Sequence, residues 1–193
     1  MGIISGRSVM FMNPIERAIR ERRSIRAYKA EPIAEEDLKA IAMAGIWAPN
    51  AMNEQLWHFT VVSDASVIER MNQANIAGTE QSGIEFLQNK VKQPEYHAFH
   101  HAPAVIIISA QEGKFTAFDC GAAAENIALA AFEKNIGSCM IASAEFMFAG
   151  DPEIRQVLKI PENHQFVCAI SLGYYDQSPK NSERTESVID YIL

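Results

Sequence analysis

The sequence lacks several motifs that would assign a chemistry at once. Neither G-x-x-x-x-G-K-[ST] nor G-x-G-x-x-G occurs in its 193 residues, so it carries no P-loop and no dinucleotide-binding fingerprint. A G-x-S-x-G nucleophile elbow is also absent, and no thiol stands out as a nucleophile. A phosphate bound by this protein must therefore be held by side chains rather than by a glycine-rich loop.

Cysteine is scarce, and positive charge is in the minority. Cys120, Cys139 and Cys168 are widely spaced within apolar runs, a pattern typical of buried thiols in a reducing compartment. The formal net charge is −7, from 24 acidic and 17 basic residues, which argues against the broad basic face of a nucleic-acid-binding protein. The longest apolar run, residues 102–110, is too short to span a bilayer, and no signal-peptide pattern opens the chain. We expect a cytoplasmic protein that binds neither nucleic acid nor a membrane.

Hydrophobic residues make up 48% of the chain, which is enough to bury a substantial core. Asn13 and Pro14 mark a helix start, because Asn can cap a helix and Pro is tolerated at its first position. Apolar periodicity predicts further helices at about 34–46 and 116–134, and apolar runs predict strands at 57–62, 105–108 and 166–172. Because these elements interleave irregularly, we expect one α+β domain over residues 13–193, after an N-terminal extension of residues 1–12.

Three segments have weaker patterns. Residues 72–101 contain polar residues, two glycines and one proline, and they predict helical pieces with a mobile connection. Asn135 to Gly137 predicts a turn, and residues 138–142 fit either a short strand or an extended loop. Asp151 and Pro152 repeat the cap-plus-proline pattern and predict a short helix that ends near Leu158.

An arginine cluster closes the first predicted helix. The run Glu21-Arg22-Arg23-Ser24-Ile25-Arg26 places three guanidinium groups around one hydroxyl, and guanidinium forks match phosphate oxygens in pairs. The alternative is a solvated basic helix end, because cations near a C-terminus suit the helix dipole. These residues alone leave both interpretations open.

A second polar stretch is the loop Ala48-Pro49-Asn50-Ala51-Met52-Asn53-Glu54-Gln55-Leu56-Trp57. Its amide side chains donate and accept hydrogen bonds, which suits a heterocycle with mixed N–H and C=O edges. Ordinary turn chemistry is the alternative, since Asn and Pro are common in turns.

Histidines gather before the predicted strand at residue 105. On a helix His97 and His101 would share a face, and with Glu95 and His100 they form a candidate metal site. The alternative is a solvent-exposed, histidine-rich helix end. Since no third ligand follows at a fixed spacing, the sequence favours the structural interpretation and no metal.

The two polar stretches together resemble the FMN-dependent nitroreductase family. The Arg22-Arg23-Ser24-Ile25-Arg26 motif follows an amphipathic helix, and an A-P-x-x-x-N-x-Q-x-W loop then enters a strand. A small-residue helix with Asp119 and Gly121 near its start, Gly137-Ser138-Cys139 after it, and Gly173-Tyr174 at the end of a strand follow in the family's order. The resemblance implies a nitroreductase-like α+β fold with a central mixed or antiparallel sheet flanked by helices.

The resemblance also implies that the first motif holds FMN. Arg22, Arg23 and Ser24 would bind the phosphate and the ribityl chain. Arg26 would lie near the pyrimidine side of the flavin ring, where a positive charge stabilises the reduced, anionic ring.

Three further segments would complete this site. One would approach the cofactor from the other subunit of a homodimer, one would line a face of the ring, and one would be a basic tail that returns to the phosphate. In that order the residues are Pro49, Asn50, Ala51 and Asn53; Met140, Ile141 and Ala142; and Arg184 with Lys180. The tail, residues 174–193, ends in apolar side chains and would form an arm that reaches the partner subunit.

The implied activity is oxidoreductase chemistry at the flavin, with no acid or base side chain assigned. Hydride would pass from NAD(P)H through FMN to a nitroaromatic, a quinone or a similar small acceptor in a ping-pong cycle. The same fold would also serve dehalogenation, fragmentation of the flavin, or flavin binding without turnover. The sequence does not distinguish NADH from NADPH or identify the physiological acceptor.

Overall fold

A computed structural model describes residues 13–177, 179 and 183–193. The N-terminal extension of residues 1–12 and the predicted ligand Lys180 lie outside these ranges. Among the described residues, strands β1 (Trp57–Val62), β2 (Ala104–Gln111), β3 (Ile136–Ile141) and β4 (His164–Tyr174) form one sheet in the order β1-β2-β4-β3. Each neighbouring pair is antiparallel. The predicted α+β fold is confirmed, with a sheet that is antiparallel rather than mixed.

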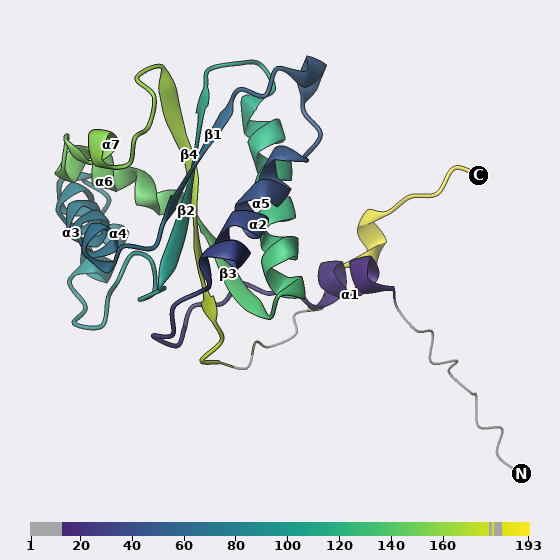
Figure 1. The fold of residues 1–193 in the computed structure, drawn as a ribbon, viewed down its shortest axis with the longest axis horizontal. Helices are drawn as coiled ribbons and strands as arrows, with labels where there is room; N and C mark the ends of the chain where they lie inside the picture. Colours follow the sequence, from purple (N-terminus) through teal and green to yellow (C-terminus); the bar gives the residue numbers. More distant parts are fainter. Residues whose placement is uncertain (1–12, 178, 180–182) are drawn as a thin grey trace, which may run out of the picture.

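Helices cover both faces of this sheet (Figure 1). One layer contains α2 (Glu35–Ile46) and α5 (Thr116–Glu133). The opposite layer contains α3 (Ala65–Gln81), α4 (Glu85–Val91), α6 (Met147–Gly150) and α7 (Ile154–Val157). Helix α1 (Pro14–Glu21) lies at the edge beyond β3, and none of the described helices is long and apolar enough to cross a membrane.

The central strand β2 supplies both cores. Its residues Val105 and Ile107 pack on the α3 side with Met71, while Ile106 and Ile108 pack on the α5 side. Side chains along a strand alternate between faces, so a continuous apolar run is what a strand covered on both sides requires. The sequence pattern at residues 105–108 therefore gave the correct element.

The segments with weaker patterns show what tertiary pairing adds. The predicted turn at Asn135 to Gly137 is wrong beyond Asn135, because β3 already begins at Ile136 and pairs with β4. The region 72–101 is more regular than predicted at its start: α3 continues to Gln81, and turns fill the chain after α4. The helix expected after Asp151 is reduced to the single turn of α7.

Helices α3 and α6 touch through their backbones. A Cβ added to Gly78 would overlap the carbonyl oxygen of Phe146, and one added to Gly150 would overlap the carbonyl oxygen of Ala74. Close contact of this kind requires glycine on both helices.

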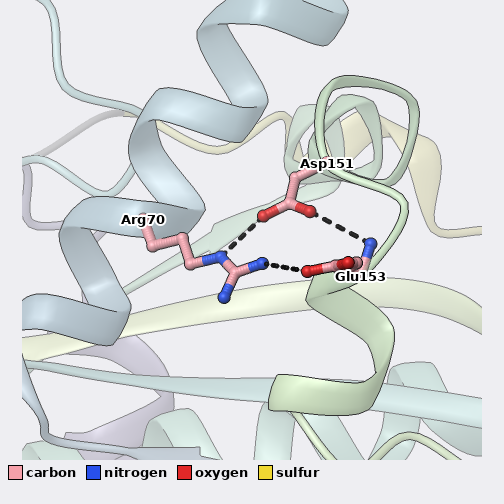
Figure 2. Close-up of polar contacts among 3 residues, drawn as sticks. All are labelled: Arg70, Asp151 and Glu153. Atoms are coloured by element: carbon pink, nitrogen blue, oxygen red, sulfur yellow. Dashed lines mark hydrogen bonds and ion pairs between the residues drawn. The ribbon is translucent and has the colours of Figure 1, made fainter.

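An ion-pair network ties α3 to the segment between α6 and α7 at the surface (Figure 2). Arg70 on α3 donates from Nε to Asp151 Oδ2 at 2.7 Å and from Nη2 to Glu153 Oε2 at 3.4 Å. Asp151 Oδ1 also accepts the Glu153 backbone N–H at 3.0 Å, so this carboxylate holds the turn that enters α7. Since the network is largely exposed, solvent screens it and it adds little to stability.

Replacing Gly78 tests the backbone contact between α3 and α6. We expect Gly78→Ala to lower the free energy of unfolding by about 1–3 kcal/mol, because the new methyl group forces the helices apart. Urea denaturation followed by circular dichroism measures this change. The control Gln81→Ala, at the exposed end of α3, should change stability by less than about 0.5 kcal/mol. Equal stabilities of the two variants would contradict the contact.

Candidate functional site

The arginine segment leaves α1 and pairs with the outer strand of the sheet. Ser24 forms a parallel bridge with Ser138, and the Ile25 N–H donates to the Ser138 carbonyl at 2.9 Å. The Ile25 side chain is 1% exposed, so it points into the core. Since side chains alternate along an extended segment, Ser24 and Arg26 point outward, and both are exposed.

A buried tyrosine, Tyr28, holds this segment through hydrogen bonds in the core. The Tyr28 hydroxyl donates to the Ile25 carbonyl at 2.7 Å and lies 2.9 Å from Ser171 Oγ on β4. Burial raises the pKa of Tyr28 far above its ordinary value, so the hydroxyl keeps its proton and remains a donor. The Ala27 carbonyl also accepts the Asp176 N–H at 3.0 Å. The backbone between Ser24 and Tyr28 is thus held at several points.

The other two arginines, Arg22 and Arg23, contact groups of the same chain. Arg22 Nε donates to Glu125 Oε1 on α5 at 3.2 Å, with the arginine side chain 22% exposed. Arg23 Nη1 donates to the carbonyl of Arg20 at 2.6 Å and to the carbonyl of Arg22 at 2.7 Å. An anion at this edge would meet Arg22 already oriented by a carboxylate.

The end of β3 follows the same edge. The parallel bridge joins Ser24 to Ser138, and Arg26 lines one cavity with Ile141, the last residue of β3. Met140 is 43% exposed, and Ile141 is buried. Ala142 opens the 3₁₀ helix η2 (Ala142–Phe146) and is exposed. Arg26 and Ile141 therefore lie near one another, and the roles of the first motif and of residues 140–142 stay predictions.

The second motif forms a strained loop. The 3₁₀ turn η1 (Ala51–Asn53) follows Asn50, whose Oδ1 accepts the Gln55 N–H at 3.0 Å. Met52 and Gln55 have φ values of 52° and 50°, in the left-handed region that side chains disfavour. The Asn53 φ of 55° makes a third such residue. Non-glycine residues in this region cluster at functional sites, where the surrounding structure holds them.

Helix α5 separates the two motifs within one chain. Asp119, in its first turn, accepts the Ala51 N–H at 3.2 Å and so holds the loop. The first motif contacts α5 further along, at Glu125, and Arg17 lies over the Phe132 ring near the helix end. Figure 1 shows η1 and α1 at opposite ends of α5. Their meeting across a homodimer stays a prediction, and so do the roles of Pro49, Asn50, Ala51 and Asn53.

The structure describes residues 174–177, 179 and 183–193 of the tail. Arg184 is exposed, and its return to the phosphate stays a prediction. The apolar side chains at the end of the chain are exposed, with Ile192 and Leu193 fully so. Trp47 on the α2 side and Phe118 on α5 are exposed too, at 79% and 76%. Such apolar surface is typical of an interface.

The histidine cluster differs from both sequence interpretations. Residues 97–101 form turns rather than a helix, and His97 is buried, 7% exposed. The described residues contain no group of three or more candidate ligands able to hold a metal. His97 Nδ1 accepts the Phe99 N–H at 3.0 Å, and its ring centroid lies 4.3 Å from that of His101.

These turns border a cavity of about 420 Å³ that also reaches the first motif. Arg26 and Ile141 line it on one side, and the turns with Lys90, Tyr96 and His100 line it on the other. Sequence reasoning missed Lys90 and Tyr96, because nothing in their spacing connects them to residue 26. The neighbouring histidine cluster was the available signal, but the sequence interpretation gave it only a structural role.

The domain has an α+β fold in which an antiparallel sheet lies between two helical layers. A cationic segment pairs with the outer strand of that sheet. A family model described as the nitroreductase family matches residues 19–174. The chain belongs to the nitroreductase family, and the family predicted from the two motifs is confirmed.

The chain is similar to several known proteins along most of its length. A protein of Archaeoglobus fulgidus, named as an NADH dehydrogenase/NAD(P)H nitroreductase, is 36% identical over 163 residues, covering 79% of this chain and 80% of that protein. A crystal structure of a nitroreductase with bound FMN from Bacteroides fragilis matches with a TM-score of 0.87 and 31% identity, covering 94% of this chain and 100% of that one. An iodotyrosine deiodinase of Thermotoga neapolitana is 23% identical over 180 residues, covering 89% of this chain and 94% of that enzyme.

The buried state of His97 makes stability depend on pH. Burial, with a smaller effect of His101, lowers the pKa of His97 to about 4, against 6.5 for an ordinary histidine. The folded protein therefore binds fewer protons than the unfolded chain between these values, and stability falls as the pH falls from about 6.5 to about 4. We expect His97 to account for roughly 2–3 kcal/mol of this loss.

Urea denaturation across this pH range measures the effect. The variant His97→Asn keeps an acceptor for the Phe99 N–H but does not titrate, so its stability should decline less steeply than that of the wild type. Parallel pH profiles for the two proteins would show that His97 is not responsible.

Proposed function

We propose that this protein is an FMN-dependent oxidoreductase that transfers hydride from NAD(P)H to a small oxidised acceptor such as a nitroaromatic or a quinone. The observation that carries the proposal is the pairing of the arginine segment with β3 at Ser24 and Ser138, which leaves Ser24 and Arg26 exposed near that strand. The FMN-bound Bacteroides fragilis nitroreductase supports it, because that chain has this fold along its whole length.

The residues present fit an FMN group. The exposed Ser24 hydroxyl and the guanidinium groups of Arg22 and Arg23 would bind the phosphate through charge-assisted hydrogen bonds. Arg26 would lie at the pyrimidine side of the ring and stabilise negative charge there. Residues 140–142, at the end of β3, would cover one face. FMN, when bound, supplies the hydride chemistry, and the protein orients and tunes it.

A second subunit would complete the site. The loop held by Asp119 lies far along α5 from the first motif, so its residues Pro49 to Asn53 would reach the cofactor of the partner. The exposed Trp47 and Phe118 and the apolar end of the tail give this homodimer a surface to bury. Arg184, with Lys180, would return to the phosphate.

The acceptor and the nicotinamide would occupy the same place in turn, which gives ping-pong kinetics. No acid or base side chain is required in this scheme, since the hydride passes through the cofactor. Water exclusion and orientation would come from the loop and from the residues after β3.

A visible absorbance spectrum of the purified protein tests the proposal. We expect a flavin spectrum that bleaches on addition of NADH or NADPH without oxygen and returns when a quinone or nitro compound is added. A colourless protein that FMN does not reconstitute would overturn the proposal. Bound FMN that neither nucleotide reduces would favour flavin binding without turnover.

A second reaction on the same fold is reductive dehalogenation, which the Thermotoga neapolitana deiodinase favours. The site geometry serves both reactions, because each draws electrons from the same cofactor. Halide release from a halogenated phenol during anaerobic turnover distinguishes dehalogenation from nitro or quinone reduction. Recovery of intact FMN after turnover excludes flavin fragmentation.

Removing one phosphate contact tests the placement of FMN. We expect Arg22→Ala to weaken FMN binding by about 1.5–3 kcal/mol, since a charge-assisted contact is lost. Fluorescence titration of the apoprotein with FMN measures this. The control Arg20→Ala removes an exposed guanidinium from the last turn of α1 and should leave the affinity nearly unchanged. Unchanged affinity in Arg22→Ala would show that the phosphate lies elsewhere.

A further inference from the structure

One peptide bond of the arginine segment lacks the backbone pairing of its neighbours. Before it, the Ile25 N–H donates to the Ser138 carbonyl at 2.9 Å, and after it the Ala27 carbonyl accepts the Asp176 N–H at 3.0 Å. The bond between them joins Ile25 to Arg26. Among the described residues, neither its carbonyl nor its N–H has a backbone partner. Another group must therefore satisfy both.

Two side chains hold this peptide bond from opposite sides. The Tyr28 hydroxyl donates to the Ile25 carbonyl at 2.7 Å, and Gln177 Oε1 accepts the Arg26 N–H at 2.9 Å. In a trans peptide the carbonyl and the N–H point in opposite directions, so each side chain holds one edge of the peptide plane. The plane cannot rotate without breaking one of these two hydrogen bonds.

Tyr28 is itself fixed on the sheet. The side chain is 8% exposed, and a Cβ added to Gly173 would lie 2.8 Å from Tyr28 Cδ1, so the ring packs directly on the backbone of β4. The hydroxyl also lies 2.9 Å from Ser171 Oγ on the same strand. Tyr28 therefore donates from a fixed position relative to the sheet.

Gln177 lies three residues beyond the end of β4. Tyr28 and Tyr175 form an antiparallel bridge, and the Asp176 N–H donates to the Ala27 carbonyl, so the chain after β4 runs beside the arginine segment. This pairing brings the Gln177 amide to the segment, where it is half-buried. The second partner of the peptide bond thus comes from the first residues of the tail.

The orientation of this peptide bond bears on the Arg26 side chain. Rotation of the peptide plane changes the φ angle of Arg26 and moves its Cβ, because both are joined at the same Cα. Arg26 would lie at the pyrimidine side of the flavin, where its guanidinium would stabilise negative charge on the reduced ring. Since a charge interaction weakens with distance, a displaced guanidinium would stabilise that charge less.

We propose that Tyr28 and Gln177 are positioning residues that act through Arg26 and set how strongly this protein prefers reduced FMN over oxidised FMN. The inference rests on the proposed function, because it requires a flavin beside Arg26. It adds two residues that lie outside the predicted cofactor-binding set and touch only the backbone of the segment.

The reduction potential of bound FMN tests the proposal without turnover. Anaerobic titration against a reference dye measures this potential, and its difference from the potential of free FMN gives the ratio of the affinities for reduced and oxidised FMN. We expect Tyr28→Phe and Gln177→Ala each to lower this ratio about threefold to tenfold, because one orienting hydrogen bond is lost. The potential should become more negative in both variants.

Two control variants separate positioning from stability. Tyr175→Phe removes the same hydroxyl from a ring that packs against the same cluster, and among the described residues this hydroxyl makes no hydrogen bond to residues 24–27. Gly78→Ala destabilises the protein at the distant contact between α3 and α6. Both controls should keep the wild-type ratio. A fall in Tyr175→Phe equal to that in Tyr28→Phe would overturn the proposal.

A double-mutant cycle shows whether the two residues act through Arg26. Arg26→Gln removes the charge on which the preference would depend. In that background, Tyr28→Phe and Gln177→Ala should leave the ratio unchanged. The proposal is wrong if either substitution lowers the ratio there as much as in the wild type, or if either single variant keeps the wild-type ratio.

Hydrogen exchange distinguishes this proposal from the proposed function. In the protein without flavin, NMR should show faster exchange of the Arg26 amide in Gln177→Ala and Tyr28→Phe than in Tyr175→Phe. If NAD(P)H reduces bound FMN but the ratio is unchanged in both variants, the positioning role is wrong and the oxidoreductase stands. If the protein binds no FMN, the oxidoreductase fails, and equal exchange rates in the three variants would show that the side chains do not hold the peptide bond either.

Discussion

The Ile25 amide donates to the Ser138 carbonyl at the outer edge of the sheet, and the rest of the candidate site depends on this pairing. With the Ile25 side chain in the core and the Tyr28 hydroxyl bound to the Ile25 carbonyl, the segment cannot turn about its axis. Its alternate residues must therefore face outward. The basic residues of this segment therefore present oriented hydrogen-bond donors beside β3, instead of forming a solvated helix end.

Helix α5 lies between the loop and the arginine segment and contacts both. Its first turn holds the strained loop through Asp119, and its middle orients Arg22 through Glu125. The two contacts are six positions apart along the helix, a rise of about 9 Å, and the loop and the arginine segment leave the helix toward different ends. As a rigid element between the two motifs, α5 keeps them apart within one chain. The same helix carries the exposed Phe118.

The cavity at Lys90, Tyr96 and His100 is bordered by the turns after α4, a segment whose sequence has weak periodicity. Connections between regular elements tolerate change, because few core contacts depend on them.

The sequence by itself determined the elements whose pattern is local. Continuous apolar residues at 105–108 specified a strand covered on both faces, and the Asn13-Pro14 pair specified a helix start that the capping box with Glu16 confirms. The motif at Arg22 to Arg26 and the loop that begins at Ala48 were sufficient for the family. What only the tertiary structure decided depends on contacts between distant residues. Ile136 joins a strand because β4 offers it a partner, and His97 is buried because Phe99 and α3 enclose its turn. Lys90 and Arg26 line the same cavity. The sequence could not predict this, because a charged residue carries no signal of which residues will lie near it in space.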